Sequence, residues 1–127
     1  MIQADSQPDH YHTEFTNGAH VATSDTTPNK GGGNRGFRPH ELLEAALATC
    51  MNMTVRMAAD KQGIPLSSVS VTVSLNREEP GKPVFEYRVQ FGEALSEAQK
   101  SRLLSAVELC PVRNTLSHPL RFIPCAP

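Results

Sequence analysis

Three cysteines, Cys50, Cys110 and Cys125, are the side chains of this sequence best suited to redox or nucleophilic chemistry. A cysteine thiolate is a strong nucleophile, whereas a neutral buried thiol packs as a small apolar group. None of the three belongs to a Cys-X-X-Cys pair, and three cysteines are too few for a disulfide-stabilised scaffold. The role of each cysteine therefore depends on the local structure around it.

The segment Cys110-Pro111-Val112-Arg113 gives a physical reason for reactivity at Cys110. Proline is favoured at the first position of a helix, which makes Cys110 the residue that caps the helix start. A thiolate there meets unpaired backbone N–H groups, and Arg113 adds positive charge one turn later. Both effects lower the pKa of a thiol. The alternative is that Cys110 is a buried apolar residue that ends the preceding helix.

Cys50 lies within a predicted long helix and has no such feature in its own neighbourhood. The residues three and four positions away are mostly apolar: Ala46, Leu47, Met53 and Thr54. Apolar surroundings raise the pKa of a thiol, so Cys50 needs a cation from elsewhere to become reactive. An arginine of a second subunit is one source, and the candidates on this chain are Arg35, Arg38 and Arg56. Cys125, close to the C-terminus, is expected to be exposed and without a role.

His10 and His12 would lie on one face of a strand and could begin a metal site. No second pair of ligands at a recognised spacing accompanies them. We therefore expect neither a metal ion nor another cofactor.

A long helix is predicted to carry Cys50. Pro39 suits the first helical position, and residues 40–62 contain no further glycine or proline and are rich in good helix formers. Gly63 and Pro65 then end the helix. Apolar positions cover a wide arc of it, so we expect it to be buried on more than one side, at the centre of the fold or of a dimer.

Two β-hairpins are predicted, one before and one after this helix. Residues 10–16 and 19–23 flank an Asn-Gly pair, which is a strong hairpin signal. Residues 67–75 and 84–91 alternate apolar and polar side chains, as half-buried strands do, and a Glu-Glu-Pro-Gly turn joins them.

Two further segments are expected to be flexible. Residues 1–9 are polar and terminal. Residues 26–38 contain three successive glycines, which predicts a mobile loop that could act as a flap beside an active site.

Two helices and a strand are predicted after the second hairpin. A capping box at residues 96–99 starts a helix that runs to Cys110. A short helix then covers residues 111–116, and a last strand covers residues 120–123. Because the elements do not alternate as βαβ units, they indicate a single α+β domain over residues 1–127.

The formal net charge of −1 gives no broad attraction to nucleic acid or to an anionic membrane. No apolar run approaches the roughly 20 residues that cross a bilayer, and the first residues lack the features of a secretory signal. We therefore expect a cytoplasmic protein with neither a nucleic-acid nor a membrane partner.

Two segments together resemble the OsmC/Ohr family of thiol-dependent proteins. Residues 38–51 are similar to the family's first cysteine motif, in which a proline and Leu-Leu precede an alanine-rich turn and the cysteine. Residues 103–116 are similar to the second motif, in which a helix runs into Cys-Pro-Val and then a leucine. The resemblance extends from Gly18 to Phe122.

The resemblance implies an OsmC-like fold: an intertwined α+β homodimer with the Cys50 helix central and each active site at the dimer interface. Cys50 would be the peroxidatic thiolate that attacks the O–O bond of an organic hydroperoxide. Cys110 would be the resolving thiol that forms a disulfide with it. A dithiol or lipoylated protein would then reduce the disulfide, and the resemblance implies no metal, haem or flavin.

The first motif departs from the peroxidase branches at one position and looks more like an uncharacterised OsmC-like branch. In the peroxidase branches an arginine and a glutamate polarise the site, and the glutamate follows the proline directly. Here His40 stands at that position and Glu41 follows it. On a regular helix Glu41 lies about 180° around from Cys50 and His40 about 80°. We therefore expect His40 to approach the thiol more readily, with Arg38 a candidate for the arginine.

These inferences predict a cysteine-based peroxidase for organic hydroperoxides, with these site residues: Cys50, Cys110, His40, Glu41 and Arg38. The alternative is a non-enzymatic OsmC-like protein that binds a small hydrophobic ligand at the dimer interface. Three methionines could line that site: Met51, Met53 and Met57. A hydrolase with Cys50 as acyl nucleophile is disfavoured, because no suitable His/Asp arrangement accompanies the cysteine.

Overall fold

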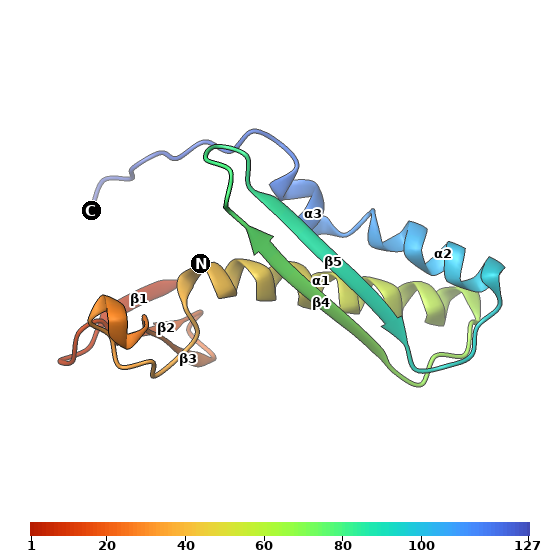
Figure 1. Ribbon diagram of the computed structural model, residues 1–127, viewed down its shortest axis with the longest axis horizontal. Coiled ribbons are helices and arrows are strands. Elements are labelled where there is room, and N and C mark those ends of the chain that lie inside the picture. Colours follow the sequence, from red (N-terminus) through yellow and green to blue (C-terminus); the bar gives the residue numbers. More distant parts are fainter. The chain divides into compact units, whose positions relative to one another are not determined.

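The computed structural model describes all residues from Met1 to Pro127, which form two compact units, residues 1–44 and 45–127. Helix α1 (Pro39–Gln62) begins in the first unit and continues in the second (Figure 1). The elements confirm the α+β class, with two small antiparallel sheets and one long helix. That the whole chain is one domain remains a prediction.

The N-terminal unit contains a three-stranded antiparallel sheet in which β2 (Thr13–Thr16) lies between β1 (Gln3–Ser6) and β3 (Val21–Ser24). Strands β2 and β3 form the hairpin predicted from the Asn-Gly pair, whose glycine, Gly18, has a φ of 97°. Within residues 1–9, expected from the sequence to be flexible, β1 pairs with β2 along its whole length; the flexibility itself remains a prediction.

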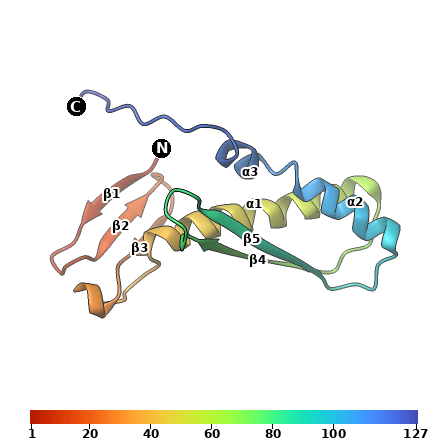
Figure 2. The same cartoon turned by 45° about the horizontal axis from the view of Figure 1, so that its top comes forward.

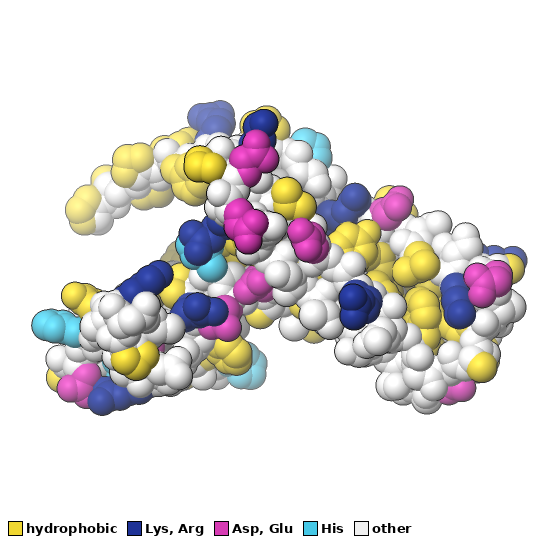
Figure 3. All heavy atoms as spheres, viewed as in Figure 1, with side chains coloured by type: hydrophobic (Ala, Val, Ile, Leu, Met, Phe, Trp, Pro, Cys, Tyr) yellow, Lys and Arg dark blue, Asp and Glu magenta, His cyan; other side chains and the backbone are white.

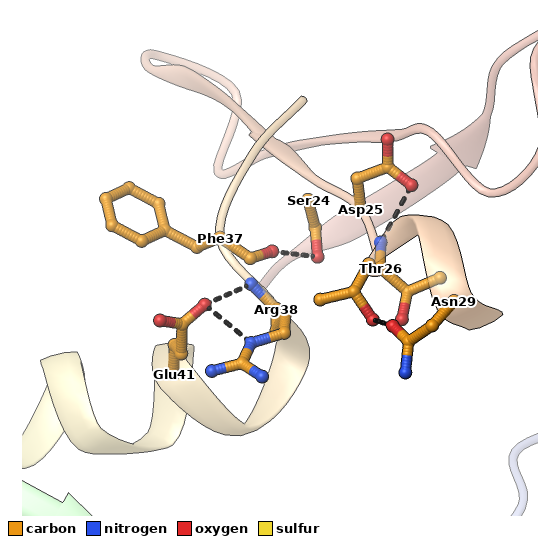
Figure 4. A network of polar contacts seen from close by, with 8 residues as sticks. Ser24, Asp25, Thr26, Asn29, Phe37, Arg38 and Glu41 are labelled. Atoms are coloured by element: carbon orange, nitrogen blue, oxygen red, sulfur yellow. Dashed lines mark hydrogen bonds and ion pairs between the residues drawn. The ribbon is translucent and has the colours of Figure 1, made fainter. Parts of the chain in front are cut away.

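The buried carboxylate of Asp25 organises the loop that follows β3 (Figure 4). Its Oδ1 accepts a hydrogen bond from the Thr26 N–H at 2.7 Å, which is drawn in the figure. Its Oδ2 accepts from the N–H groups of Gly33 and Arg35, both at 3.1 Å. These bonds close the loop on both sides of a short 3-10 turn, η1 (Pro28–Lys30). A hydrogen-bonded loop therefore replaces the mobile segment expected from the glycine run.

Glycines are needed here because the backbone approaches itself closely. A Cβ atom at Gly32 would lie 2.3 Å from the carbonyl oxygen of Thr26. A Cβ atom at Gly36 would lie 2.3 Å from the carbonyl oxygen of Thr23. Since both neighbours are backbone atoms, the glycines permit close packing rather than motion.

Helix α1 has its predicted bounds, and Gly63 follows it with a φ of 66°. Its buried residues recur at every fourth position: Leu47, Met51, Val55 and Ala59. This single stripe is narrower than the predicted arc. Met53 and Met57 lie outside it and are 58% and 68% exposed.

The C-terminal unit packs the second part of α1 against a hairpin and two short helices (Figures 1 and 2). Strands β4 (Val69–Asn76) and β5 (Val84–Phe91) pair as predicted, and α2 (Glu97–Val107) starts with the predicted capping box. It stops short of Cys110, its predicted end, because the next amides form tighter three-residue turns. The short helix α3 (Pro111–Leu116) follows.

One apolar core joins α1, α2 and the turns between elements, and the inner face of the β4–β5 hairpin packs against it. Its buried members are Leu47, Met51, Val55, Ala59, Ile64, Leu95, Leu103, Val107 and Cys110. Cys110 is thus a core residue as well as a candidate for chemistry.

The predicted strand over residues 120–123 is absent. The segment after α3 has no regular structure, and it exposes apolar side chains (Figure 3): Leu120, Phe122 and Ile123. A strand needs a neighbour for its backbone hydrogen bonds, and no strand of the chain pairs with this segment.

None of the helices combines the length and the apolar character that crossing a membrane requires.

Candidate active site

The side chains of Cys50 and Cys110 meet in the C-terminal unit, where α1 passes the turn between α2 and α3. Both residues are free cysteines. The Cys110 side chain lies close enough to the Cys50 sulfur to act as a hydrogen-bond donor that lowers the pKa of Cys50. Cys110 is fully buried, whereas Cys50 is half-buried. The structure therefore brings together the two cysteines that the sequence singled out.

Packing and backbone hydrogen bonds fix the turn that carries Cys110. Val112 packs against the core cluster to which Cys110 and Val107 belong. The Cys110 N–H donates to the carbonyl oxygen of Val107 at 3.1 Å, and the Cys110 carbonyl accepts from the Asn114 N–H at 3.0 Å. Pro111 begins α3 in the predicted position.

Hydrogen bonds lower the pKa of Cys50, although burial opposes them. Burial is the largest single influence and raises the pKa, but bonds to the thiolate from the Cys110 thiol, the Val112 N–H and the Thr54 hydroxyl together outweigh it. The Thr54 contribution is the smallest of the three, and in the structure the Thr54 hydroxyl donates to the Cys50 carbonyl oxygen at 2.8 Å. Cys50 is thus the more acidic thiol of the pair.

The structure corrects the expectation that Cys110 is the activated thiol. Cys110 does cap α3. However, burial and the hydrogen bond that it gives to Cys50 raise its pKa, and the N–H groups of Arg113 and Val112 do not reverse this. The Val112 N–H at the start of α3 also acts on Cys50 and lowers its pKa. The sequence indicated these N–H groups but not that they act on both cysteines.

Two of the arginines proposed as activating cations have other partners. Arg56 donates to the carbonyl oxygen of Leu66. Arg35 pairs with Asp9 in the N-terminal unit. Within the C-terminal unit, hydrogen-bond donors rather than a cation stabilise the Cys50 thiolate.

Arg38 and Glu41 form an ion pair around the start of α1 (Figure 4). Glu41 Oε1 accepts hydrogen bonds from the Arg38 N–H at 2.9 Å and from Arg38 Nε at 3.1 Å. These bonds lower the pKa of the Glu41 carboxyl, and the bond from the Arg38 backbone N–H contributes most. His40 is exposed. The structure brings Arg38 and Glu41 together, while the role of all three residues toward Cys50 remains a prediction.

A pocket of about 150 Å³ is built from α1, which carries Cys50, from α3 and the residue after it, and from β5. Its lining is Leu47, Met51, Phe85, Tyr87, Arg113, Leu116 and Ser117. Sequence reasoning proposed only Met51 as a pocket residue and named Leu47 and Arg113 for their places near the cysteines, because the lining comes together from three separate elements. Met53 lines a different hollow beside β4, so the methionines do not share one pocket.

Cys125 is exposed, as expected. No group of three or more His, Cys, Asp or Glu side chains is arranged to hold a metal ion.

Known families and structures share features with this chain. A model of the family described as OsmC-like protein matches residues 31–123. No curated protein matches the chain.

Solved bacterial structures have a similar fold. An OsmC like protein from Mycoplasma pneumoniae superposes with a TM-score of 0.72 at 21% identity, covering 92% of this chain and 86% of that chain. The organic hydroperoxide resistance protein OsmC from Legionella pneumophila gives 0.65 at 23% identity, covering 91% and 87%. The organic hydroperoxide resistance protein OhrB of Bacillus subtilis gives 0.63 at 21% identity, covering 91% and 87%. At these identities the likeness establishes the fold.

Proposed function

The chain belongs to the OsmC-like protein family, and on that premise we propose that it is a cysteine-based peroxidase that reduces organic hydroperoxides through a Cys50–Cys110 disulfide. One observation carries the proposal: a half-buried thiol with a lowered pKa meets a buried thiol with a raised pKa. Two structures of similar fold bear the name organic hydroperoxide resistance protein, which supports the same substrate class here.

In the first step, the Cys50 thiolate attacks the distal oxygen of the hydroperoxide. An S–O bond forms as the O–O bond breaks, so Cys50 becomes a sulfenic acid and the released alkoxide takes up a proton to give an alcohol. The lowered pKa increases the thiolate fraction, and partial exposure of Cys50 gives the peroxide access to the sulfur.

In the second step, the Cys110 sulfur attacks the sulfenic sulfur of Cys50. The S–S bond forms, and the sulfenic hydroxyl leaves with the Cys110 proton as water. The raised pKa of Cys110 suits this role. It keeps Cys110 protonated, as a hydrogen-bond donor to the Cys50 thiolate, until the peroxide has reacted.

A dithiol reductant completes the cycle. Two thiol–disulfide exchanges return two electrons to the pair and leave the reductant as a disulfide. The family resemblance suggests a lipoylated protein for this task. Because free thiols persist in reducing compartments, we place the protein in the cytoplasm.

We propose that Arg38, His40 and Glu41 supply the polar groups that orient the hydroperoxide. The family resemblance calls for an arginine and a glutamate, and Arg38 and Glu41 are paired here through two hydrogen bonds. The bond from the Arg38 N–H fixes the Glu41 carboxylate, and the bond from Arg38 Nε then orients the guanidinium against it. Glu41→Gln should therefore slow peroxide reduction while leaving the pKa of Cys50 unchanged.

We also propose the homodimer that the family resemblance implies. Exposed apolar residues supply a reason for association, because Met53, Met57 and Phe122 are 58%, 68% and 89% exposed in the single chain. Light scattering at several protein concentrations should give the mass of a dimer. A monomer at every concentration would contradict the proposal.

One equivalent of cumene hydroperoxide, added to the reduced protein, tests the mechanism. Mass spectrometry should find a Cys50–Cys110 crosslink. In Cys110→Ser the Cys50 sulfenic acid should persist and react with dimedone. Cys125→Ser is the matched control and should behave as the wild type. Recovery of both Cys50 and Cys110 as free thiols would refute the mechanism.

Turnover separates the peroxidase from a non-enzymatic binding protein. Cys50→Ser should lower the rate of peroxide reduction about a thousandfold or more, because it removes the nucleophile. Equal rates near background in wild type and variant would favour the binding protein.

A further inference from the structure

We propose that Arg113 is a positioning residue for the thiol pair, because its side chain closes the turn that carries Cys110. This deepens the peroxidase proposal by naming a residue that sets the rate of disulfide closure. Only the claim about disulfide closure rests on the peroxidase proposal. The claim about the turn rests on its own hydrogen bonds and is tested on the reduced protein without peroxide.

Cys110 is the buried residue of the turn between α2 and α3 (Figure 1). It is fully buried, whereas Leu109 before it is 79% exposed and Pro111 after it is also exposed. Pro111 has no N–H group, so it adds no backbone donor to the turn. Packing therefore holds the Cys110 side chain, and hydrogen bonds must hold the backbone on either side of it.

Arg113 supplies one of these bonds from its side chain. Its Nη1 donates to the carbonyl oxygen of Glu108 at 2.9 Å. Glu108 caps the C-terminal end of α2, where the last carbonyl groups of a helix lack an intrahelical partner. The last turn of α2 contains no basic residue of its own. The arginine of α3 thus takes the place that a lysine or arginine often has at a helix end.

The bond between Arg113 and Glu108 closes a loop around two groups that act on Cys50. Cys110 and Val112 lie inside this loop, and the Cys110 thiol and the Val112 N–H both lower the pKa of Cys50 against the effect of burial. The same loop holds the Cys110 sulfur where it attacks the sulfenic acid of Cys50. A catalytic step between two groups is fast when their relative position is fixed beforehand.

The charge of Arg113 is not what acts on Cys50. Burial raises the pKa of Cys50, and the groups that lower it are the Cys110 thiol, the Val112 N–H and the Thr54 hydroxyl. Arg113 is not among them, so its effect passes through the geometry of the turn.

A titration of the reduced protein tests the turn. Arg113→Met, made in Cys125→Ser protein, removes the donors and keeps a long side chain. It should raise the pKa of Cys50, followed by the ¹³Cβ signal, because the donors to the thiolate are less well placed while burial still opposes charge. Arg102→Met, at an exposed arginine of α2, is the matched control and should leave this pKa unchanged. An unchanged pKa of Cys50 in Arg113→Met would overturn the proposal.

Salt separates the geometry of the turn from the charge of the guanidinium. The acceptor is a neutral carbonyl group, so the pKa of Cys50 should respond to salt equally in the wild type and in Arg113→Met. A pKa that rises with salt in the wild type alone would show that the charge acts directly on the thiolate, and this would also overturn the proposal.

Stopped-flow kinetics with cumene hydroperoxide test the effect on disulfide closure. Arg113→Met should slow the step from the Cys50 sulfenic acid to the disulfide about tenfold. A purely structural Arg113 would lower the melting temperature without changing this rate or the pKa of Cys50, which would refute the proposal. Should Arg113→Met fail to fold, Arg113→Lys decides, because lysine keeps the charge without the planar fork. A closure rate below that of the wild type supports the proposal, and a wild-type rate overturns it.

The two proposals fail in different ways. If the wild type forms no disulfide while Arg113→Met still raises the pKa of Cys50, the peroxidase proposal and the closure claim fail and the role of Arg113 in the turn stands. If the wild type forms the disulfide and Arg113→Met changes neither the closure rate nor the pKa, the role of Arg113 fails and the peroxidase stands.

Discussion

The two units of the chain bury different kinds of side chain, yet each lowers the pKa of one acidic group by similar means. The N-terminal unit buries Ser24 and Asp25, whereas the C-terminal unit buries apolar residues, Cys110 among them. Burial opposes the ionisation of both Asp25 and Cys50, and hydrogen bonds outweigh it in both cases. Cys110 shows the converse, since burial first, and then the hydrogen bond that it gives to Cys50, raise its pKa. Burial and the direction of a few donors together decide which group carries charge.

The largest effect should come from the apolar core of the C-terminal unit. Leu103→Ala removes a fully buried side chain and should lower the free energy of unfolding by about 2–5 kcal/mol, measured by urea denaturation. Leu104→Ala, at the next position of α2, is the control, because this side chain is 43% exposed and its loss should cost far less. If both variants lost the same free energy of unfolding, the assignment of Leu103 to the core would be contradicted.

A smaller and more local effect is expected in the N-terminal unit from Asp25→Asn. The amide NH₂ group cannot accept hydrogen bonds, so the N–H groups on the side that it faces, either Thr26 or Gly33 and Arg35, lose their acceptor. Hydrogen exchange should accelerate about tenfold for at least one of these three amides. The exposed Asp5→Asn serves as control and should leave them unchanged. Unchanged exchange in Asp25→Asn would show that the loop does not depend on the carboxylate.

Acidification should weaken the same loop more gradually. Burial raises the pKa of Asp25, but backbone hydrogen bonds bring it below the model-compound value of 3.8, and the bond from Thr26 contributes most among them. Because the pKa of Asp25 is lower in the folded than in the unfolded state, its ionised form stabilises the fold fully at pH values above the unfolded-state pKa. This stabilisation is lost as the pH falls through the folded-state pKa. The amide signals of Gly33 and Arg35 should therefore hold steady down to about pH 4 and shift below it. A shift near neutral pH would contradict this sign.

The elements were predictable where their signals are local. Pro39 and Gly63 mark the ends of α1, and alternation marks the β4–β5 hairpin, because each signal depends only on adjacent residues. Strand β1 has polar residues and owes its existence to pairing with β2, which no local pattern reveals. The segment 120–123 has strand-like residues but lacks a partner strand.

The candidate site was predictable in its residues but not in its electrostatics. Both cysteines follow from the sequence, as does the helix start beside Cys110. That the Val112 N–H acts on Cys50 as well as on Cys110 depends on how α3 packs against α1, and this is a tertiary feature. The pocket around Arg113 was missed for the same reason, because its walls come from three elements.

The central claim is that Cys50 is the more acidic thiol because Cys110 and the start of α3 give it hydrogen bonds. A titration of the ¹³Cβ signals of both cysteines, in reduced Cys125→Ser protein, reports which sulfur loses its proton first. We predict that Cys50 titrates at lower pH than Cys110. We also predict that Cys110→Ala raises the pKa of Cys50, and that Cys110→Ser raises it less, because the hydroxyl can still donate. Earlier titration of Cys110, or a Cys50 pKa that Cys110→Ala leaves unchanged, would contradict the account.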